Sequence, residues 1–393
     1  MKKKIIISIL VSIILISVLT LSVNVAILKT TVKSFNDFPE SGCAEPEIEN
    51  YDNGCYNITT DKDFKVMQLT DVHVGGGWMS YKEDKMALNA VAAIITAEKP
   101  DLVVLSGDLT FPVPFFAGTF NNKTGAIEIA ELMEKLGVYW TMTFGNHDTE
   151  VYNYFNREKI SEFYSSGKYP HCLYQPGPEN VDGYGNQLFN IKNSKGDVIR
   201  SFILFDSHAY TPDDFLGILW HYDNIHQNQV DWYSEKIDEI KEMNGGKVAP
   251  TSVILHIPLV EYRDAWYEYT DNGMKDTQNV KYIRGVIGEE DPYILCGVGE
   301  DDLFETIIEK GSTDSVFCGH DHLNNTVLNY KGINLVYGYS IDYLAYSGID
   351  KIGSQRGCVV MNISAEDGSQ EIIHENYYQD KYKPFYEKEE VTM

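Results

Sequence analysis

Five short apolar stretches of this chain end on residues that can bind metal ions. They end at Asp71-Val72-His73, Gly107-Asp108, Gly145-Asn146-His147-Asp148, Leu255-His256 and Gly319-His320-Asp321-His322. Hard cations prefer carboxylate and amide oxygens, whereas borderline transition metals also take imidazole. A set of two aspartates, one asparagine and four histidines therefore suits Mn, Fe, Co or Zn better than Ca or Mg. Seven ligands are too many for one open catalytic site and fit two ions that share one carboxylate. The candidate ligands are Asp71, His73, Asp108, Asn146, His256, His320 and His322.

Each of these residues follows a segment with the pattern of a buried or half-buried strand. The first half of the chain predicts strands at 64–70, 102–106 and 138–144, with helices at 84–98 and 127–136 between them. In a parallel α/β sheet, ligands bind at the carboxyl edge of the strands. The β-α-β-α-β order therefore predicts that the polar strand ends lie close together.

The second half predicts more strands and helices around an irregular segment. Strands are expected at 187–191, 198–205, 251–255, 326–330, 333–337, 357–363 and 370–374, and helices at 229–243 and 302–309. Residues 258–300 are rich in tyrosine, glycine and acidic residues, and we expect an irregular insertion over the site.

The charge of the chain excludes one class of function. Its 393 residues carry a formal net charge of −26. A nucleic-acid-binding surface needs a basic stripe, so we expect none. Phosphate binding to so acidic a protein needs a local positive source, and bound metal ions are such a source.

The N-terminus predicts a membrane segment. Lys2 to Lys4 precede an apolar run from Ile5 to Leu28, and about 20 apolar residues span a bilayer. The run is long for a signal peptide and lacks a clean cleavage site, which favours an uncleaved signal anchor over a cleaved, secreted form. The lysines then stay in the cytoplasm and the rest of a single-pass protein is exported. We expect an anchor or signal peptide at 1–30, a polar stalk at 31–62, a catalytic domain at 63–378 and a charged tail at 379–393.

The six cysteines form no CxxC pair, so a zinc ribbon is not expected. Cys43 and Cys55 lie close together in a polar stretch after the membrane segment, and we expect a disulfide between them. Cys318 lies in a strand and is expected to be a buried free thiol.

The order D-x-H, G-D, G-N-H-D, a lone strand-end histidine and G-H-x-H resembles that of the calcineurin-like metallophosphoesterases. The resemblance covers roughly residues 64–340 and is similar in detail to the purple acid phosphatase-related branch. It implies an α/β fold, a four-layer α/β/β/α sandwich of two mixed sheets packed face to face.

The resemblance also implies roles for the strand-end residues. Asp71, His73 and His322 would hold a first metal ion, Asn146, His256 and His320 a second, and Asp108 would bridge both. His147 would stand beside the substrate as general acid or charge stabiliser, with Asp148 orienting it. Asp321 is expected to pack or cap rather than bind metal.

The implied function is a dinuclear metal-dependent phosphoric ester hydrolase, in which a hydroxide between the ions attacks phosphorus. We expect phosphomonoesters as substrates, with a phosphodiesterase or nucleotide pyrophosphatase as the alternative. A surface binding protein without turnover is the alternative of another class. Purple enzymes of the branch have a tyrosine three residues after the bridging aspartate, where this chain has Phe111. A tyrosinate–Fe(III) site is therefore not expected, and the metal pair (Mn, Fe, Zn or Co) stays open.

The remaining histidines carry no motif. They are His171, His208, His221, His226 and His374. We expect His208 to be an ordinary loop histidine, with an approach to the site as the alternative. We expect His221 and His226 to be solvated.

Overall fold

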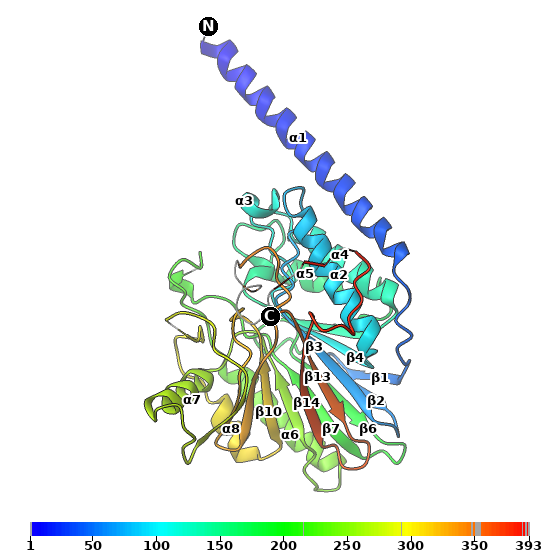
Figure 1. The fold of residues 1–393 in the computed structure, drawn as a ribbon, viewed down its shortest axis with the longest axis vertical. Coiled ribbons are helices and arrows are strands. Elements are labelled where there is room, and N and C mark those ends of the chain that lie inside the picture. Colours follow the sequence, from blue (N-terminus) through cyan, green and yellow to red (C-terminus); the bar gives the residue numbers. More distant parts are fainter. Residues whose placement is uncertain are drawn as a thin grey trace.

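Two mixed β-sheets pack face to face, and helices cover their outer faces (Figure 1). This computed structural model describes residues 2–214, 216–291, 293–346, 349, 355–386, 388–389 and 391. The expected four-layer arrangement is confirmed by three separate apolar cores. One core lies between the sheets, and one lies outside each sheet.

The smaller sheet has five strands in the order β14-β13-β3-β4-β5. Its parallel part comprises β3 (Phe64–Leu69), β4 (Leu102–Ser106) and β5 (Trp140–Thr143). Its antiparallel part comprises β13 (Gly357–Ile363) and β14 (Gln370–Asn376). Helices α2 (Tyr81–Glu98), α4 (Asn122–Leu136) and α5 (Arg157–Tyr164) lie over its outer face.

The larger sheet has nine strands in the order β1-β2-β6-β7-β8-β10-β12-β11-β9. Its centre is parallel: β7 (Val198–Leu204), β8 (Thr251–Ile254), β10 (Thr313–Cys318) and β12 (Ile333–Tyr337). Its flanks are β1 (Glu47–Asp52), β2 (Cys55–Thr59), β6 (Gln187–Lys192), β11 (Val327–Tyr330) and β9 (Val280–Arg284). Helices α6 (Gln227–Met243), α7 (Val260–Asp271) and α8 (Leu303–Lys310) pack on its outer face.

Short helical turns lie at the edge of the sheets. They are α3 (Pro114–Ala117), η2 (His147–Thr149) and η3 (Pro212–Asp214). Helices α2 and α4 begin a few residues earlier than their apolar spacing predicts, because the first turns of both helices contain polar side chains. Helix α4 is capped by Gly137, whose φ of 64° suits a left-handed cap.

Residues 31–62 are not a polar stalk, contrary to expectation. Strand β1 pairs with β2, and β2 runs parallel to β6, so this segment completes one edge of the larger sheet. Side chains that alternate in burial, such as Ile58 in β2, fill the space between the sheets. The expected disulfide is also wrong, because both cysteines are free thiols. Cys55 is buried in β2 of the larger sheet, whereas Cys43 packs against the outer core of the smaller sheet. Cys318 is a buried free thiol, as expected.

Two other segments are more ordered than predicted. The described part of the expected tail packs on the smaller sheet's outer core through Tyr382, Phe385 and Tyr386. The expected insertion at 258–300 contains α7 and β9.

Helix α1 (Lys2–Ser34) extends far beyond the domain (Figure 1). Its apolar part is long enough to cross a membrane, and the same property is found in signal sequences. Its C-terminal part contacts α4. Asn24 and Thr31 are buried there, and Phe35 of the following turn η1 (Phe35–Asp37) joins the core.

Candidate metal centre

The strand-end residues of both sheets meet at one edge of the sandwich. Asp71, Asp108 and Asn146 follow β3, β4 and β5 of the smaller sheet, whereas His256 and His320 follow β8 and β10 of the larger sheet. The carboxyl ends of these parallel strands point to the same edge, which is why side chains far apart in sequence converge there.

The converging side chains form two groups that share one carboxylate. Asp71, His73, Asp108 and His322 form the first group, and Asp108, His256 and His320 form the second. Within each group the potential ligand atoms lie within 4.8 Å of one another. All are buried. The Oδ2 atom of Asp108 lies 3.4 Å from Nε2 of His73 and 3.2 Å from Nε2 of His256, so this carboxylate stands between the groups.

The hydrogen bonding of these groups tests whether metal ions fit. Buried polar atoms in proteins nearly always have a hydrogen-bond partner. Each buried polar atom that lacks one lowers the stability of the fold by about 1–3 kcal/mol. Here a cluster of buried ligand atoms has no hydrogen-bond partner in the structure: Asp108 Oδ2, Asn146 Oδ1, His73 Nε2, His256 Nε2 and both ring nitrogens of His320. Carboxylate, amide and imidazole atoms left free in this way fit two transition-metal ions.

The backbone is held in uncommon conformations at the same residues. Asp71, His73, Asp108 and His320 all have φ between 50° and 75°. Such strain concentrates at functional sites. Gly145 and Gly319 allow the close approach: a Cβ on Gly145 would collide with Asp108, and one on Gly319 with Thr70 and Asp71.

Asn146 is held by its amide nitrogen, which donates to the Tyr210 hydroxyl at 3.0 Å. This bond leaves Oδ1 of Asn146 free to act as a ligand. Tyr210 belongs to the long connection between β7 and α6, where no local sequence pattern marks it.

Glu150, not Asp148, orients His147. Nδ1 of His147 lies 2.8 Å from Oε1 of Glu150. Asp148 instead accepts backbone N–H groups of Leu109, Thr110 and Gly145 at 2.8–2.9 Å, which fixes the loop that carries Asp108. The expected role of Asp148 is therefore corrected. The reason is the turn η2, because residues three apart lie on the same side of a 3₁₀ turn.

Asp342 is a further residue that no motif revealed. Its carboxylate lies 3.8 Å from Nδ1 of His73 and 3.5 Å from Nδ1 of His322, on the side of both rings away from the aspartates. It accepts three backbone N–H groups, from Leu344, Ala345 and Tyr346, at 2.6–2.8 Å. A polar residue shortly after the predicted strand 333–337 was the one signal that could have identified it.

The electrostatics balance two carboxylates against several imidazoles. Burial would lower the pKa of His73, His147, His256 and His322, but the nearby carboxylates outweigh it and raise all four, that of His256 to about 9. Burial raises the pKa of Asp71 and Asp108, but the histidines outweigh it, so that the pKa of Asp71 falls to about 2. Bound cations would replace these protons as the partners of the carboxylates.

Two other expectations concern residues beside the centre. Asp321 accepts the hydroxyl of Tyr337 at 2.6 Å and lies outside both ligand groups, in agreement with a packing role. Phe111 packs edge-on against His73 and His147, with ring centroids 5.4 and 5.0 Å apart. His208 does not join the centre, because it groups with Asp223 and His226 instead.

The chain is similar to several proteins whose names contain the word phosphatase. The chain is 29% identical over 322 residues to probable inactive purple acid phosphatase 14 of Arabidopsis thaliana, covering 74% of each chain. It is 27% identical over 312 residues to probable inactive purple acid phosphatase 29 of the same plant, again covering 74% of each. It is 28% identical over 288 residues to phosphatase DCR2 of Saccharomyces cerevisiae, covering 69% of this chain and 46% of the yeast protein.

A solved structure and a family profile complete the comparison. A dimetal phosphatase from Danio rerio is similar in fold, with a TM-score of 0.53 and 11% identity, covering 81% of this chain and 98% of that chain. The profile of the calcineurin-like phosphoesterases matches residues 64–324. This match spans well over half of the sequence, and the chain belongs to the calcineurin-like phosphoesterase family.

Proposed function

We propose that this protein is a dinuclear metal-dependent hydrolase of phosphate monoesters. The observation that carries the proposal is the set of buried ligand atoms without partners in two groups that share Asp108. The relatives named phosphatases favour monoesters over diesters.

The proposed ligands follow the two groups. Asp71, His73 and His322 would hold one ion, Asn146, His256 and His320 the other, and Asp108 both. When bound, such an ion pair lowers the pKa of water and neutralises charge on the phosphate oxygens. The chain supplies the rest. Asp342 would hold His73 and His322 in orientation from behind, and Tyr210 would keep the amide oxygen of Asn146 toward the centre.

His147 is the proposed proton donor. Its Nδ1 is engaged by Glu150, so Nε2 is the nitrogen left to face a substrate. Burial opposes its charge, but Asp108 and Glu150 raise its pKa, which keeps a proton on the ring. A proton on Nε2 can pass to the leaving-group oxygen as the ester bond breaks.

Some relatives carry the word inactive in their names. Activity is proposed here from this chain's own residues, because all seven proposed ligands and His147 are present. A binding protein without turnover would have no need of a polarised histidine beside the ligand groups.

We propose further that α1 is retained as a membrane anchor, with the catalytic domain outside the cytoplasm. Asn24 accepts the backbone N–H of Trp78 at 3.0 Å and donates to the Gly118 carbonyl at 3.4 Å. Thr31 is buried against α4. Cleavage after residue 28 would remove Asn24 from the fold, which favours an anchor over a signal peptide.

Metal reconstitution of the full chain in detergent tests the activity. The protein is stripped of metal, supplied with Mn, Zn, Fe or Co singly, and assayed on para-nitrophenyl phosphate and bis-para-nitrophenyl phosphate. We expect metal-dependent release from the monoester, with two ions bound. Faster release from the diester would replace the monoesterase with a phosphodiesterase. Two bound ions without release from either ester would favour the binding protein.

A further inference from the structure

Exposed apolar side chains gather on both sides of the metal centre. We define the apolar rim as Trp78, Phe115, Phe116, Ile218, Leu219 and Trp220, which are 50–87% exposed. A soluble acidic protein rarely exposes so many large apolar groups near one site, and such patches mark interaction surfaces. Trp220 also has a φ of 60°, so its exposed indole is presented by strained backbone.

Topology places the rim at the edge that carries the candidate metal centre. Trp78 lies in the connection that leaves the carboxyl end of β3. Phe115 and Phe116 lie in the connection that leaves the carboxyl end of β4. Ile218 to Trp220 lie in the connection that leaves the carboxyl end of β7, which is parallel to β8 and its His256.

Ring contacts connect the loops that carry the rim to the candidate metal centre. The ring of Phe116 lies 6.0 Å from that of Phe111, and Phe111 lies 5.0 Å from His147. On the other side, the connection that carries Trp220 also carries Tyr222, whose ring lies 4.4 Å from that of His320.

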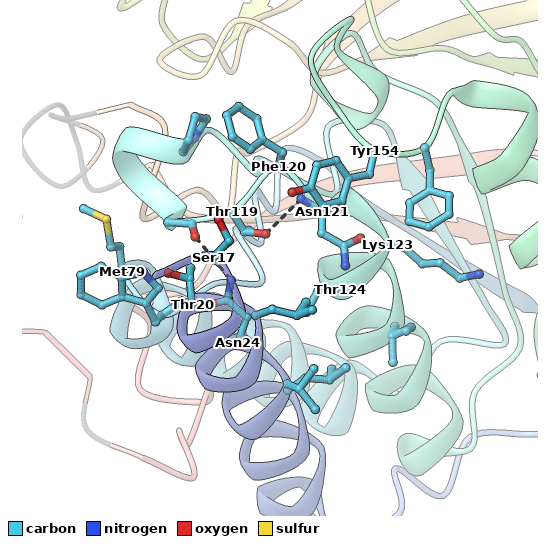
Figure 2. Close-up of a pocket in the computed structure, with 18 residues that line it drawn as sticks. Ser17, Thr20, Asn24, Met79, Thr119, Phe120, Asn121, Lys123, Thr124 and Tyr154 are labelled. Carbon is cyan, nitrogen blue, oxygen red and sulfur yellow. Dashed lines mark hydrogen bonds between the residues drawn. The ribbon is translucent and has the colours of Figure 1, made fainter. Parts of the chain in front are cut away.

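Helix α1 lies beside the part of the rim that contains Trp78, Phe115 and Phe116. The polar side chains of Ser17, Thr20 and Asn24 face the domain and line a cavity of about 520 Å³ with Trp78, Phe120 and Tyr154 (Figure 2). The face of α1 turned away from the cavity at this level is apolar and exposed, as at Val18 and Leu19.

The length of α1 sets the level of the bilayer. Ile5 to Val23 span about 29 Å at about 1.5 Å per residue, close to the roughly 30 Å hydrocarbon core. The domain extends beside α1 as far as Ser17, which is about two turns nearer the N-terminus of the helix than Asn24. Ser17 lies six residues before Val23, or roughly 9 Å inside this span. Loops at that height therefore pass through the interfacial layer, where tryptophan and other aromatic side chains are enriched, and reach the outer part of the hydrocarbon core.

From these observations we propose that the apolar rim is seated in the bilayer that α1 spans, so that the metal centre hydrolyses phosphate esters carried by lipids of that leaflet. The proposal rests on the hydrolase activity and on retention of α1. Net charge excludes electrostatic attraction to anionic lipid as the main force, because the chain carries −26. Apolar insertion beside an anchoring helix is the remaining source of affinity.

Tryptophan fluorescence tests the seating directly. The full chain is reconstituted in phosphatidylcholine vesicles with or without bromine on the acyl chains. Residues 1–77 contain no tryptophan, so α1 itself gives no signal. We expect a loss of up to about two fifths of the emission, since Trp78 and Trp220 are two of five tryptophans. The double variant W78F/W220F should lose this quenching. Equal emission in both lipids would overturn the proposal, as would emission that changes with protein concentration alone, which would assign the rim to a second copy.

Turnover tests the substrate class. Phosphate release from a diacylglycerol phosphate in the vesicles is divided by release from para-nitrophenyl phosphate. Phe115→Asp should lower this ratio by about tenfold, because the 87% exposed ring would no longer enter the bilayer. Val248→Asp is the matched control, since Val248 is 47% exposed and precedes β8 at the opposite edge.

The possible failures are distinguishable. Equal ratios in the Phe115 and Val248 variants would overturn the role of the rim. Quenching together with hydrolysis of the soluble ester alone would overturn the lipid substrate. Quenching without hydrolysis of any ester would refute the hydrolase activity and leave only the seating in place.

Discussion

Two clusters of histidine and aspartate lie near the same edge of the sandwich, and they differ in how their atoms are partnered. The candidate metal centre is buried, and many of its potential ligand atoms have no hydrogen-bond partner. The second cluster, His208, Asp223 and His226, also brings its potential ligand atoms within 4.8 Å of one another, but it is half-buried.

The atoms of the second cluster are already engaged. Nδ1 of His226 lies 2.8 Å from Asp182 and its Nε2 3.3 Å from Asp223. Nε2 of His208 lies 2.9 Å from the side-chain oxygen of Gln229. The two imidazoles stack with centroids 4.0 Å apart. The polar atoms of such a cluster bind one another, neighbouring side chains or water, so the cluster needs no ion.

The comparison shows that ligand type and proximity do not by themselves define a metal site. Burial without hydrogen-bond partners is the property that separates the first cluster from the second. The following predictions test this distinction.

Asp108→Asn should have the largest effect. The amide cannot supply the shared negative charge, so we expect loss of both ions and a fall in monoester turnover of about a thousandfold. Elemental analysis and the para-nitrophenyl phosphate assay measure the two effects. Asp321→Asn is the matched control, because Asp321 is a buried aspartate at the same edge that lies outside the ligand groups.

His147→Ala should keep both ions and lower turnover by about 100- to 10,000-fold, as expected for a general acid. Retained activity would contradict the proposed role. Glu150→Gln sharpens the test through pH. Removing a carboxylate that raises the pKa of His147 should lower this pKa, so the alkaline limb of the activity profile should move to lower pH.

Asp342→Asn should weaken metal binding by about tenfold, because outer partners of ligating histidines orient the rings and raise their basicity. The measurement is competition with a chelator, which reports affinity independently of turnover. Unchanged affinity would show that Asp342 only holds the loop at 344–346 in place.

His226→Gln should have the smallest effect, with metal content and turnover unchanged within about twofold. Burial lowers the pKa of His226, but Asp182 and Asp223 outweigh it and raise the pKa. The ion pairs of His226 with Asp182 and Asp223 therefore stabilise the fold fully below the unfolded-state pKa of histidine, about 6.5. This stabilisation is lost as the pH rises through the pKa of His226 in the folded state. Because the ring is partly exposed, we expect a loss of less than about 1 kcal/mol at pH 5, measured by chemical denaturation. Loss of a bound ion on this substitution would remove the distinction between the clusters.

Local pattern was sufficient to predict the elements that carry the proposed ligands. Asp71, Asp108 and His256 each follow an apolar run that forms a strand, and strand direction alone brings such ends to one edge. The sandwich fold was predicted through its resemblance to a family, since the pairing of β3 with β13, which are far apart in the sequence, has no local signal. Segment 31–62 was misjudged for that reason, because the weak alternation of β1 and β2 becomes meaningful only beside β6.

The sequence by itself determined which residue types stand at the strand ends, that the N-terminus is apolar enough to cross a membrane, and that the chain is strongly acidic. Only the tertiary structure decided that Glu150 rather than Asp148 faces His147, that Asp342 stands behind two histidines, and that Asn24 joins α1 to the domain. These are contacts between segments distant in sequence or set by the pitch of a single turn. Their geometry depends on how whole layers pack, which no short pattern of residues encodes.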